Sequence, residues 1–112
     1  MRSISKIEWP LNMPVRRAEY RLAPDAERDL ELIWHYTFEE WGLEQAHRYT
    51  DELTEAFARL AAKPNIASAA DHIRKGYRRT RVGRHVIYIR PEEYGIAVVR
   101  VLHDRMLPAR HL

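Results

Sequence analysis

Cysteine is absent from this chain of 112 residues, and its absence excludes disulfide bonds and thiolate-bound metal sites. Long apolar runs are also absent, since no stretch approaches the roughly 20 residues that a membrane-spanning helix needs. The first dozen residues lack the apolar core of a signal peptide. We therefore expect a cytoplasmic protein that does not bind a membrane.

The composition is that of one small globular domain. Hydrophobic residues make up 46% of the chain and charged residues 31%, which is typical of a soluble folded protein and not of a disordered one. A chain of this length buries about 65% of the surface that it exposes when unfolded, which is enough for a single core.

The net charge of +3 hides a separation of the two signs along the chain. The segment from Asp25 to Glu55 is mainly acidic. The segment from His72 to Pro91 has no acidic residue, and its cationic residues are Arg74, Lys75, Arg78, Arg79, Arg81, Arg84 and Arg90. A small domain with such a distribution has an electric field that can steer one charged partner towards one face.

Two amphipathic helices joined by a single glycine are predicted between residues 24 and 62. Pro24 is tolerated in a first helical turn, and the acidic residues that follow it favour the helix dipole. Gly42 can end the first helix, and Pro64 prevents the second helix from continuing. Because one residue connects them, the helices form an antiparallel hairpin. The residues of the two apolar stripes are Ala26, Leu30, Ile33, Trp34, Thr37, Phe38 and Trp41 in the first helix, and Leu43, Ala46, Tyr49, Leu53, Ala56, Phe57 and Leu60 in the second.

One strand before the helices and three strands after them are predicted. The first spans residues 19–22, and the others span 77–82, 85–90 and 96–103. Gly83 and Arg84 form a two-residue hairpin turn, and residues 91–95 form the next turn. The last strand is apolar on both faces, which is typical of a central strand. The order β-α-α-β-β-β predicts an α+β fold, in which the helical hairpin packs on a small antiparallel sheet.

The first residues of the chain lie outside this pattern. Pro10 and Pro14 interrupt them, and they show no periodicity. We expect a poorly structured N-terminal extension of residues 1–18, followed by one domain of residues 19–112. Met13 is an alternative to Met1 as the native start of translation.

No group of residues forms a recognisable catalytic or metal site. The six histidines have no spacing that would place metal ligands on one face of a helix. His103 lies at the end of the last predicted strand and could act as a general base, because imidazole exchanges protons near neutral pH. Pairing of His103 with the neighbouring Asp104 is the favoured interpretation. We therefore assign no catalytic residue, no metal and no cofactor.

The cationic strand 77–82 permits three interpretations of about equal weight. Arg79 and Arg81 alternate to one face together with Tyr77, so this face could bind RNA through phosphate contacts and base stacking. It could equally bind the carboxylates of an acidic, disordered peptide. The third interpretation is a sheet face that is simply solvated.

Two apolar residues of the first helix fall outside its stripe. Leu32 and Tyr36 are expected to be exposed, and such side chains can seat an amphipathic partner segment. Scattered apolar residues are normal on protein surfaces, and that interpretation is somewhat favoured for either residue alone.

Three segments of the chain resemble the ParE branch of the RelE/ParE toxin superfamily. They read AERDLELIWHYTFEEWGLEQAHRYTDELTEAFARLA, IRKGYRRTRVGRHVIYIR and VVRVLHDRMLPARHL, and the match runs in the right order and spacing from Tyr20 to the C-terminus. The resemblance implies a helical hairpin on an antiparallel sheet. It also implies the toxin of a type II toxin–antitoxin system, encoded beside a ParD-like antitoxin that has a DNA-binding part and a disordered tail that folds around the toxin.

The cellular target differs between branches of this superfamily. ParE-type toxins are known for poisoning DNA gyrase, whereas RelE-type toxins cleave mRNA on the ribosome with arginines, lysines and a C-terminal tyrosine. Arg81 could match one RelE-type arginine. This chain has no tyrosine after Tyr94, however, which favours a toxin that is not an enzyme.

The resemblance therefore implies DNA gyrase as the target, without sequence-specific binding of nucleic acid. A ribosome-dependent mRNA endonuclease and a non-toxic relative that binds an antitoxin are the alternatives. The residues that we predict for antitoxin binding are Leu32, Tyr36, Arg79 and Arg81, and those for contact with the target are Arg84, His103, Arg105 and Arg110.

Overall fold

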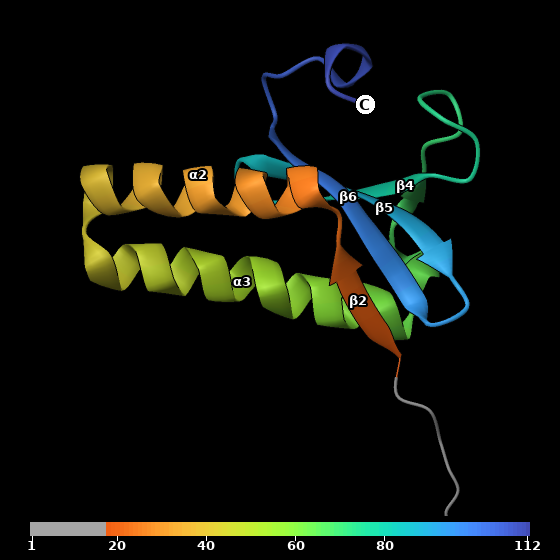
Figure 1. The fold of residues 1–112 in the computed structure, drawn as a ribbon, viewed down its shortest axis with the longest axis horizontal. Coiled ribbons are helices and arrows are strands. Elements are labelled where there is room, and N and C mark those ends of the chain that lie inside the picture. The colour runs from red at the N-terminus through yellow and green to blue at the C-terminus, as the bar shows by residue number, and fades with distance from the viewer. Residues whose placement is uncertain (1–17) are drawn as a thin grey trace, which may run out of the picture.

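Two long helices lie against one face of a five-stranded sheet in the computed structural model, which describes residues 18–112 (Figure 1). The helices are α2 (Pro24–Trp41) and α3 (Leu43–Ala62), and two short 3-10 helices follow, η1 (Pro64–Ile66) and η2 (Pro108–Arg110). The strands are β2 (Glu19–Leu22), β3 (Ser68–Ala69), β4 (Arg78–Val82), β5 (His85–Glu92) and β6 (Gly95–His103), in the sheet order β2-β6-β5-β4-β3. The predicted α+β fold is confirmed, and β6 is an interior strand as expected. Apart from Ala18, the predicted N-terminal extension of residues 1–18 and the alternative start at Met13 lie outside the described residues.

The helical hairpin has the predicted bounds because local signals mark both of its ends. Gly42 has a positive φ of 93°, and its backbone N–H donates to the carbonyl of Phe38 at 2.8 Å. The backbone N–H of Lys63 donates to the carbonyl of Arg59 at 3.0 Å, and Pro64 follows directly. A single residue therefore reverses the chain between α2 and α3.

The core lies between the sheet and the part of the hairpin that covers it. It includes Ala26 and Ile33 of α2, Leu53, Phe57 and Leu60 of α3, Ile87 and Ile89 of β5, and Ile96, Val98 and Val101 of β6.

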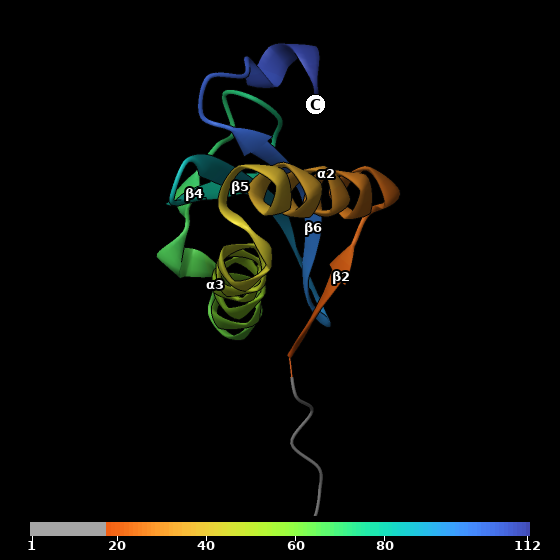
Figure 2. The same cartoon turned by 90° about the vertical axis from the view of Figure 1, so that its left-hand side faces the viewer.

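The helices extend beyond the sheet at their Gly42 end, as Figure 1 shows from the side. Figure 2 looks from that end, with the turn between α2 and α3 in front. Phe38, Trp41 and Leu43 belong to the predicted apolar stripes, but there is no sheet for them to pack against. All three are exposed, and Trp41 exposes 73% of its surface. The apolar stripes therefore continue beyond the core at this end of the hairpin.

The sheet is mixed, which corrects the purely antiparallel sheet of the prediction. Strand β2 pairs in parallel with β6, from Glu19 opposite Gly95 to Leu22 opposite Val98. A parallel pair needs a long crossover, and the helical hairpin with the β4–β5 meander supplies it. Gly95 is required at this pairing, because its φ is +142° and an added Cβ would lie 2.0 Å from the carbonyl oxygen of Glu19.

Two details of the predicted strands also differ. Strand β5 continues through Pro91 and Glu92 into the predicted turn. Strand β4 begins at Arg78, opposite Ile89, so at Pro91 β5 is paired only with β6, and proline is tolerated there. The short strand β3 lies in a segment predicted as a loop, and it pairs with Arg78 and Arg79 of β4.

The alternation of side chains along β4 separates Arg79 and Arg81 from the helices. Val82 packs against the core, so Arg79 and Arg81 lie on the opposite face of the sheet. Tyr77 precedes the strand and is buried. It is therefore not the exposed stacking platform of the RNA-binding interpretation.

Asp29 of α2 and Arg100 of β6 form a largely buried ion pair that joins the helices to the sheet. The guanidinium of Arg100 donates from Nε to Oδ2 of Asp29 at 2.8 Å and from Nη2 to Oδ1 at 2.9 Å. The backbone N–H of Val101 donates to the same carboxylate at 2.9 Å. Nη1 of Arg100 donates to the carbonyl of His111 at 2.7 Å, so one guanidinium also holds the C-terminal segment.

We predict that Asp29→Ala lowers the free energy of unfolding by about 3 kcal/mol, because it leaves a buried guanidinium and a buried N–H without their acceptor. Urea unfolding measures this loss. The matched control is Asp25→Ala, on the same helix, where the carboxylate pairs with Arg28 at the surface. Removal of that exposed pair costs less than about 1 kcal/mol. Equal losses for the two variants would contradict the structural role of Asp29.

Candidate functional site

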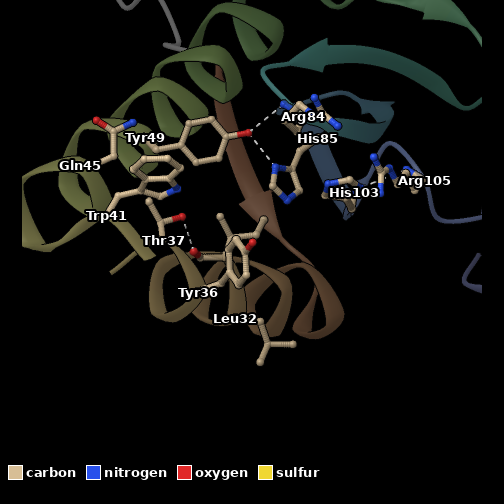
Figure 3. Close-up of a pocket in the computed structure, with 11 residues that line it drawn as sticks. Leu32, Tyr36, Thr37, Trp41, Gln45, Tyr49, Arg84, His85, His103 and Arg105 are labelled. Atoms are coloured by element: carbon tan, nitrogen blue, oxygen red, sulfur yellow. Dashed lines mark hydrogen bonds between the residues drawn. The ribbon is translucent and has the colours of Figure 1, made fainter. Parts of the chain in front are cut away.

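A groove of about 810 Å³ lies where the helical hairpin faces the ends of β5 and β6 (Figure 3). Its lining residues are Leu32, Ile33, Tyr36, Thr37, Trp41, Gln45, Tyr49, Arg84, His85, His103 and Arg105. None of them is acidic, while arginine and histidine side chains from the strand ends form one side. The groove therefore combines an apolar side with a cationic side.

The apolar side of the groove comes from the exposed part of helix α2. Leu32 exposes 69% of its surface and Tyr36 66%, and both lie on the face of α2 that borders the groove. Trp41 continues this surface towards the Gly42 turn. It also lines a neighbouring hollow of about 470 Å³, together with Glu44, Gln45 and Arg48. Exposed apolar side chains gathered at one place are typical of surfaces that bind a partner.

Tyr49 of α3 connects the helices to the turn between β4 and β5. Its hydroxyl oxygen lies 2.7 Å from Nδ1 of His85 and 3.1 Å from the carbonyl oxygen of Val82. The backbone N–H of Arg84 donates to the same oxygen at 3.3 Å. These dashed contacts at His85 and Arg84 are visible in Figure 3.

Asp104 partly balances the positive charge beside the groove. Arg81 forms an ion pair with it, and Nε of Arg84 lies 3.7 Å from its Oδ2. Nδ1 of His103 lies 3.1 Å from its Oδ1, so the two side chains are neighbours as predicted, but this Nδ1 accepts a hydrogen bond from the backbone N–H of Arg105 at 3.1 Å and makes none to Asp104. Burial raises the pKa of Asp104, but the hydrogen bond from Arg81 and the nearby positive charges outweigh that effect and hold the pKa below its ordinary value.

The groove presents a histidine and a tyrosine that are uncharged at neutral pH. The rings of His85 and His103 are 5.5 Å apart between centroids. Burial, followed by the neighbouring His103, lowers the pKa of His85 below 6.5. Burial raises the pKa of Tyr49 above 10.0, although the hydrogen bond from Arg84 acts in the opposite direction. Neither His85 nor Tyr49 therefore adds charge to the groove at neutral pH.

The structure brings several of the predicted contact residues together. Arg84, His103 and Arg105, predicted for the target, line one groove with Leu32 and Tyr36, predicted for the antitoxin. These roles stay predictions.

The other predicted contact residues lie outside the groove. Arg79 and Arg81 lie on the far face of β4, and Arg81 is engaged with Asp104. Arg110 lies in η2 and is exposed.

Tyr49, His85 and Trp41 line the groove but were not predicted as site residues from the sequence. Tyr49 and Trp41 fit the apolar stripes of the helices, and His85 begins a strand of the sheet core. Its place in the apolar stripe was one signal that Tyr49 contacts a distant residue, because a half-buried tyrosine needs a hydrogen-bond partner for its hydroxyl. The partner is far away in the sequence, and local patterns do not identify it.

Among residues 18–112, no group of three or more histidine, aspartate and glutamate side chains is arranged to hold a metal ion. Within the same residues, no helix is long and apolar enough to cross a membrane.

Comparisons with known proteins identify similar chains. A family model described as the ParE toxin of the type II toxin–antitoxin system parDE matches residues 20–108. Toxin ParE1 of Mycobacterium tuberculosis is 46% identical over 96 residues, which are 85% of this chain and 98% of that protein. Toxin ParE1 of Caulobacter vibrioides is 38% identical over 93 residues, which are 83% of this chain and 96% of that protein.

A solved structure of the chromosomal ParDE system from P. aeruginosa has the same fold. Its TM-score is 0.66, and the match covers 80% of this chain and 98% of that chain. Because the two sequences are 16% identical, this likeness concerns the fold alone.

We predict that burial of His85 makes the fold less stable in mild acid. Since the pKa of His85 is lowered on folding, the unfolded chain binds a proton that the folded chain does not, at pH values from about 6.5 down to the folded pKa. The free energy of unfolding therefore falls with pH in this window, by at most about 1.4 kcal/mol per pH unit.

Urea unfolding of the wild type and of His85→Gln between pH 7.5 and pH 5 measures this contribution. The variant should lose less stability than the wild type as the pH falls. His72→Gln, at an exposed loop position, is the control and should follow the wild type. Parallel curves for the wild type and His85→Gln would argue against a buried, neutral His85.

Proposed function

The chain belongs to the ParE toxin family of type II toxin–antitoxin systems, and on this basis we propose that a ParD-like antitoxin neutralises it and that it acts by inhibiting DNA gyrase. The observation that carries the proposal is the match of residues 20–108 to the family, together with 46% identity over nearly the full length of a curated ParE1 toxin. Gyrase follows from the known action of the ParE branch. The family match by itself supports the toxin and its antitoxin.

The position of Arg81 supports a toxin that acts by contact and not as a nuclease. Arg81 is the residue that could match an arginine of the RelE-type nucleases. Its guanidinium is paired with Asp104, so an RNA phosphate would have to compete with a carboxylate that is already in place. Arg84 and Arg105 are left to supply the positive charge of the groove.

The groove supports neutralisation by an antitoxin segment that binds over it. The antitoxin-binding residues that we propose in the groove, Leu32 and Tyr36, line it together with Arg84 and His103. An antitoxin segment bound to the apolar side would therefore also cover the cationic side, where its carboxylates would be favoured. Arg79 and Arg81 remain proposed contacts for a further part of the antitoxin, on the opposite face of the sheet.

An mRNA endonuclease is the second candidate, because two imidazoles lie close together beside arginines. His85 and His103, with ring centroids 5.5 Å apart, could act as the acid and the base of a metal-free cleavage. Arg84 and Arg105 would then stabilise the charge of the phosphate.

We predict that induction of this chain alone in a bacterium causes filamentous growth and a DNA-damage response. The purified protein should block supercoiling of relaxed plasmid by DNA gyrase and increase the amount of cleaved DNA. Pulse labelling of protein synthesis is measured in parallel. Immediate arrest of translation with cleaved mRNA would favour the nuclease, and normal growth would favour a non-toxic relative that binds the antitoxin.

We predict that Tyr36→Ala combined with Leu32→Ala weakens binding of the antitoxin encoded beside this chain at least tenfold, which corresponds to about 1.4 kcal/mol. Isothermal titration calorimetry measures the affinity. Ile66→Ala is the control, because Ile66 is a large apolar residue that is also exposed but lies in η1, outside the groove. If the control and the double variant bind alike, Leu32 and Tyr36 are not part of the antitoxin interface.

A further inference from the structure

We propose that Tyr49 positions the cationic side of the groove for contact with the target, an inference that rests on the proposed toxin function. Tyr49 is a residue of the helices, whereas Arg84 and His85 belong to the sheet. Its hydroxyl contacts both of them and the carbonyl of Val82. One oxygen atom therefore sets where the β4–β5 turn lies relative to the hairpin.

The hydroxyl of Tyr49 has a single proton, and this determines which ring nitrogen of His85 carries a hydrogen. A phenol has one proton to donate, and the carbonyl of Val82 can only accept a hydrogen bond. The backbone N–H of Arg84 can only donate. All three contacts of Tyr49 are satisfied together when its proton goes to Val82 and Nδ1 of His85 carries the hydrogen that it donates to Tyr49. Neutral His85 then has an unprotonated Nε2.

This proton arrangement gives the cationic side of the groove a hydrogen-bond acceptor at Nε2 of His85. His85 lines the groove and is neutral at pH 7, so its Nε2 can accept a hydrogen bond from a partner. The side chains of Arg84 and Arg105 can only donate. A partner that fits this side therefore presents carboxylates or phosphates together with one N–H or O–H donor.

Gly83 is fitted to the ring of Tyr49. Its φ of +58° favours glycine, and an added Cβ would lie 2.7 Å from the hydroxyl oxygen of Tyr49 and 2.8 Å from Cε1. The ring of Tyr49 thus lies directly against the backbone of the turn, and only glycine at position 83 leaves room for this ring.

The turn is held from two sides. The carbonyl of Arg84 accepts a hydrogen bond from the backbone N–H of Asp104 at 2.8 Å, which joins the turn to the segment after β6. The N–H of Arg84 donates to Tyr49, which joins the turn to α3. Loss of the tyrosine hydroxyl would free the turn from the helices while leaving its connection to the sheet.

The variant that tests this proposal is Tyr49→Phe, which removes the hydroxyl and keeps the ring. Tyr20→Phe is the matched control, because Tyr20 is also half-buried but packs on Phe57, outside the groove. Growth after induction and inhibition of gyrase supercoiling are measured for both. We expect the concentration of Tyr49→Phe needed for half-inhibition to rise at least tenfold, and that of Tyr20→Phe to stay within twofold of the wild type.

Two spectroscopic measurements separate positioning from a general loss of stability. In nitrogen-edited NMR spectra, His85 of the wild type should carry its hydrogen on Nδ1, and Tyr49→Phe should shift it towards Nε2. Hydrogen exchange at the Arg84 amide should become faster in Tyr49→Phe, while exchange at the core residues Leu53 and Ile87 stays unchanged.

The outcomes that would overturn the proposal differ from those that would refute the proposed function. Full activity of Tyr49→Phe, a wild-type His85 with its hydrogen on Nε2, or unchanged exchange at Arg84 would each overturn the role of Tyr49. A wild-type chain that neither arrests growth nor inhibits gyrase would refute the proposed toxin activity. The exchange and NMR measurements would then still show whether Tyr49 holds the turn.

Discussion

The ion pair between Asp29 and Arg100 is the contact on which the arrangement of this molecule depends. It joins the first helix to the interior strand β6, and the same guanidinium holds the carbonyl of His111 near the C-terminus. A charged pair in a largely buried place adds little net stability compared with apolar packing, but it strongly disfavours arrangements that separate the two charges. The pair therefore determines where α2 lies on the sheet, and with it where the free end of the hairpin lies.

The Gly42 end of the hairpin, which extends beyond the sheet, forms the apolar side of the groove. Because the helices are longer than the face of the sheet that they cover, the residues near Gly42 have an apolar surface without a core to enter. Trp41 and Tyr36 remain exposed there, opposite the ends of β5 and β6. Tyr49 is the place where the two sides of the groove meet, through hydrogen bonds to the turn of the sheet.

Asp104 and the burial of His85 limit the positive charge of the groove. Asp104 engages Arg81 and approaches Arg84 and His103, and burial keeps His85 neutral. What remains is a small cationic surface beside a larger apolar one. Such a surface suits a partner segment that has both apolar and acidic side chains.

The sequence by itself determined what depends on neighbours along the chain. The helix ends at Pro24, Gly42 and Pro64, the strands other than β3, and the Gly83–Arg84 turn follow from local periodicity and backbone preferences. The exposure of Leu32 and Tyr36 follows from the helical periodicity of α2. Tertiary structure alone decided the parallel pairing of β2 with β6, the pairing of Asp29 with Arg100, and the contact of Tyr49 with His85. It also decided that Phe38 and Trp41 stay exposed. The physical reason is that these features depend on how far the sheet extends and on contacts between residues more than 30 positions apart, and the periodicity of a single element contains neither.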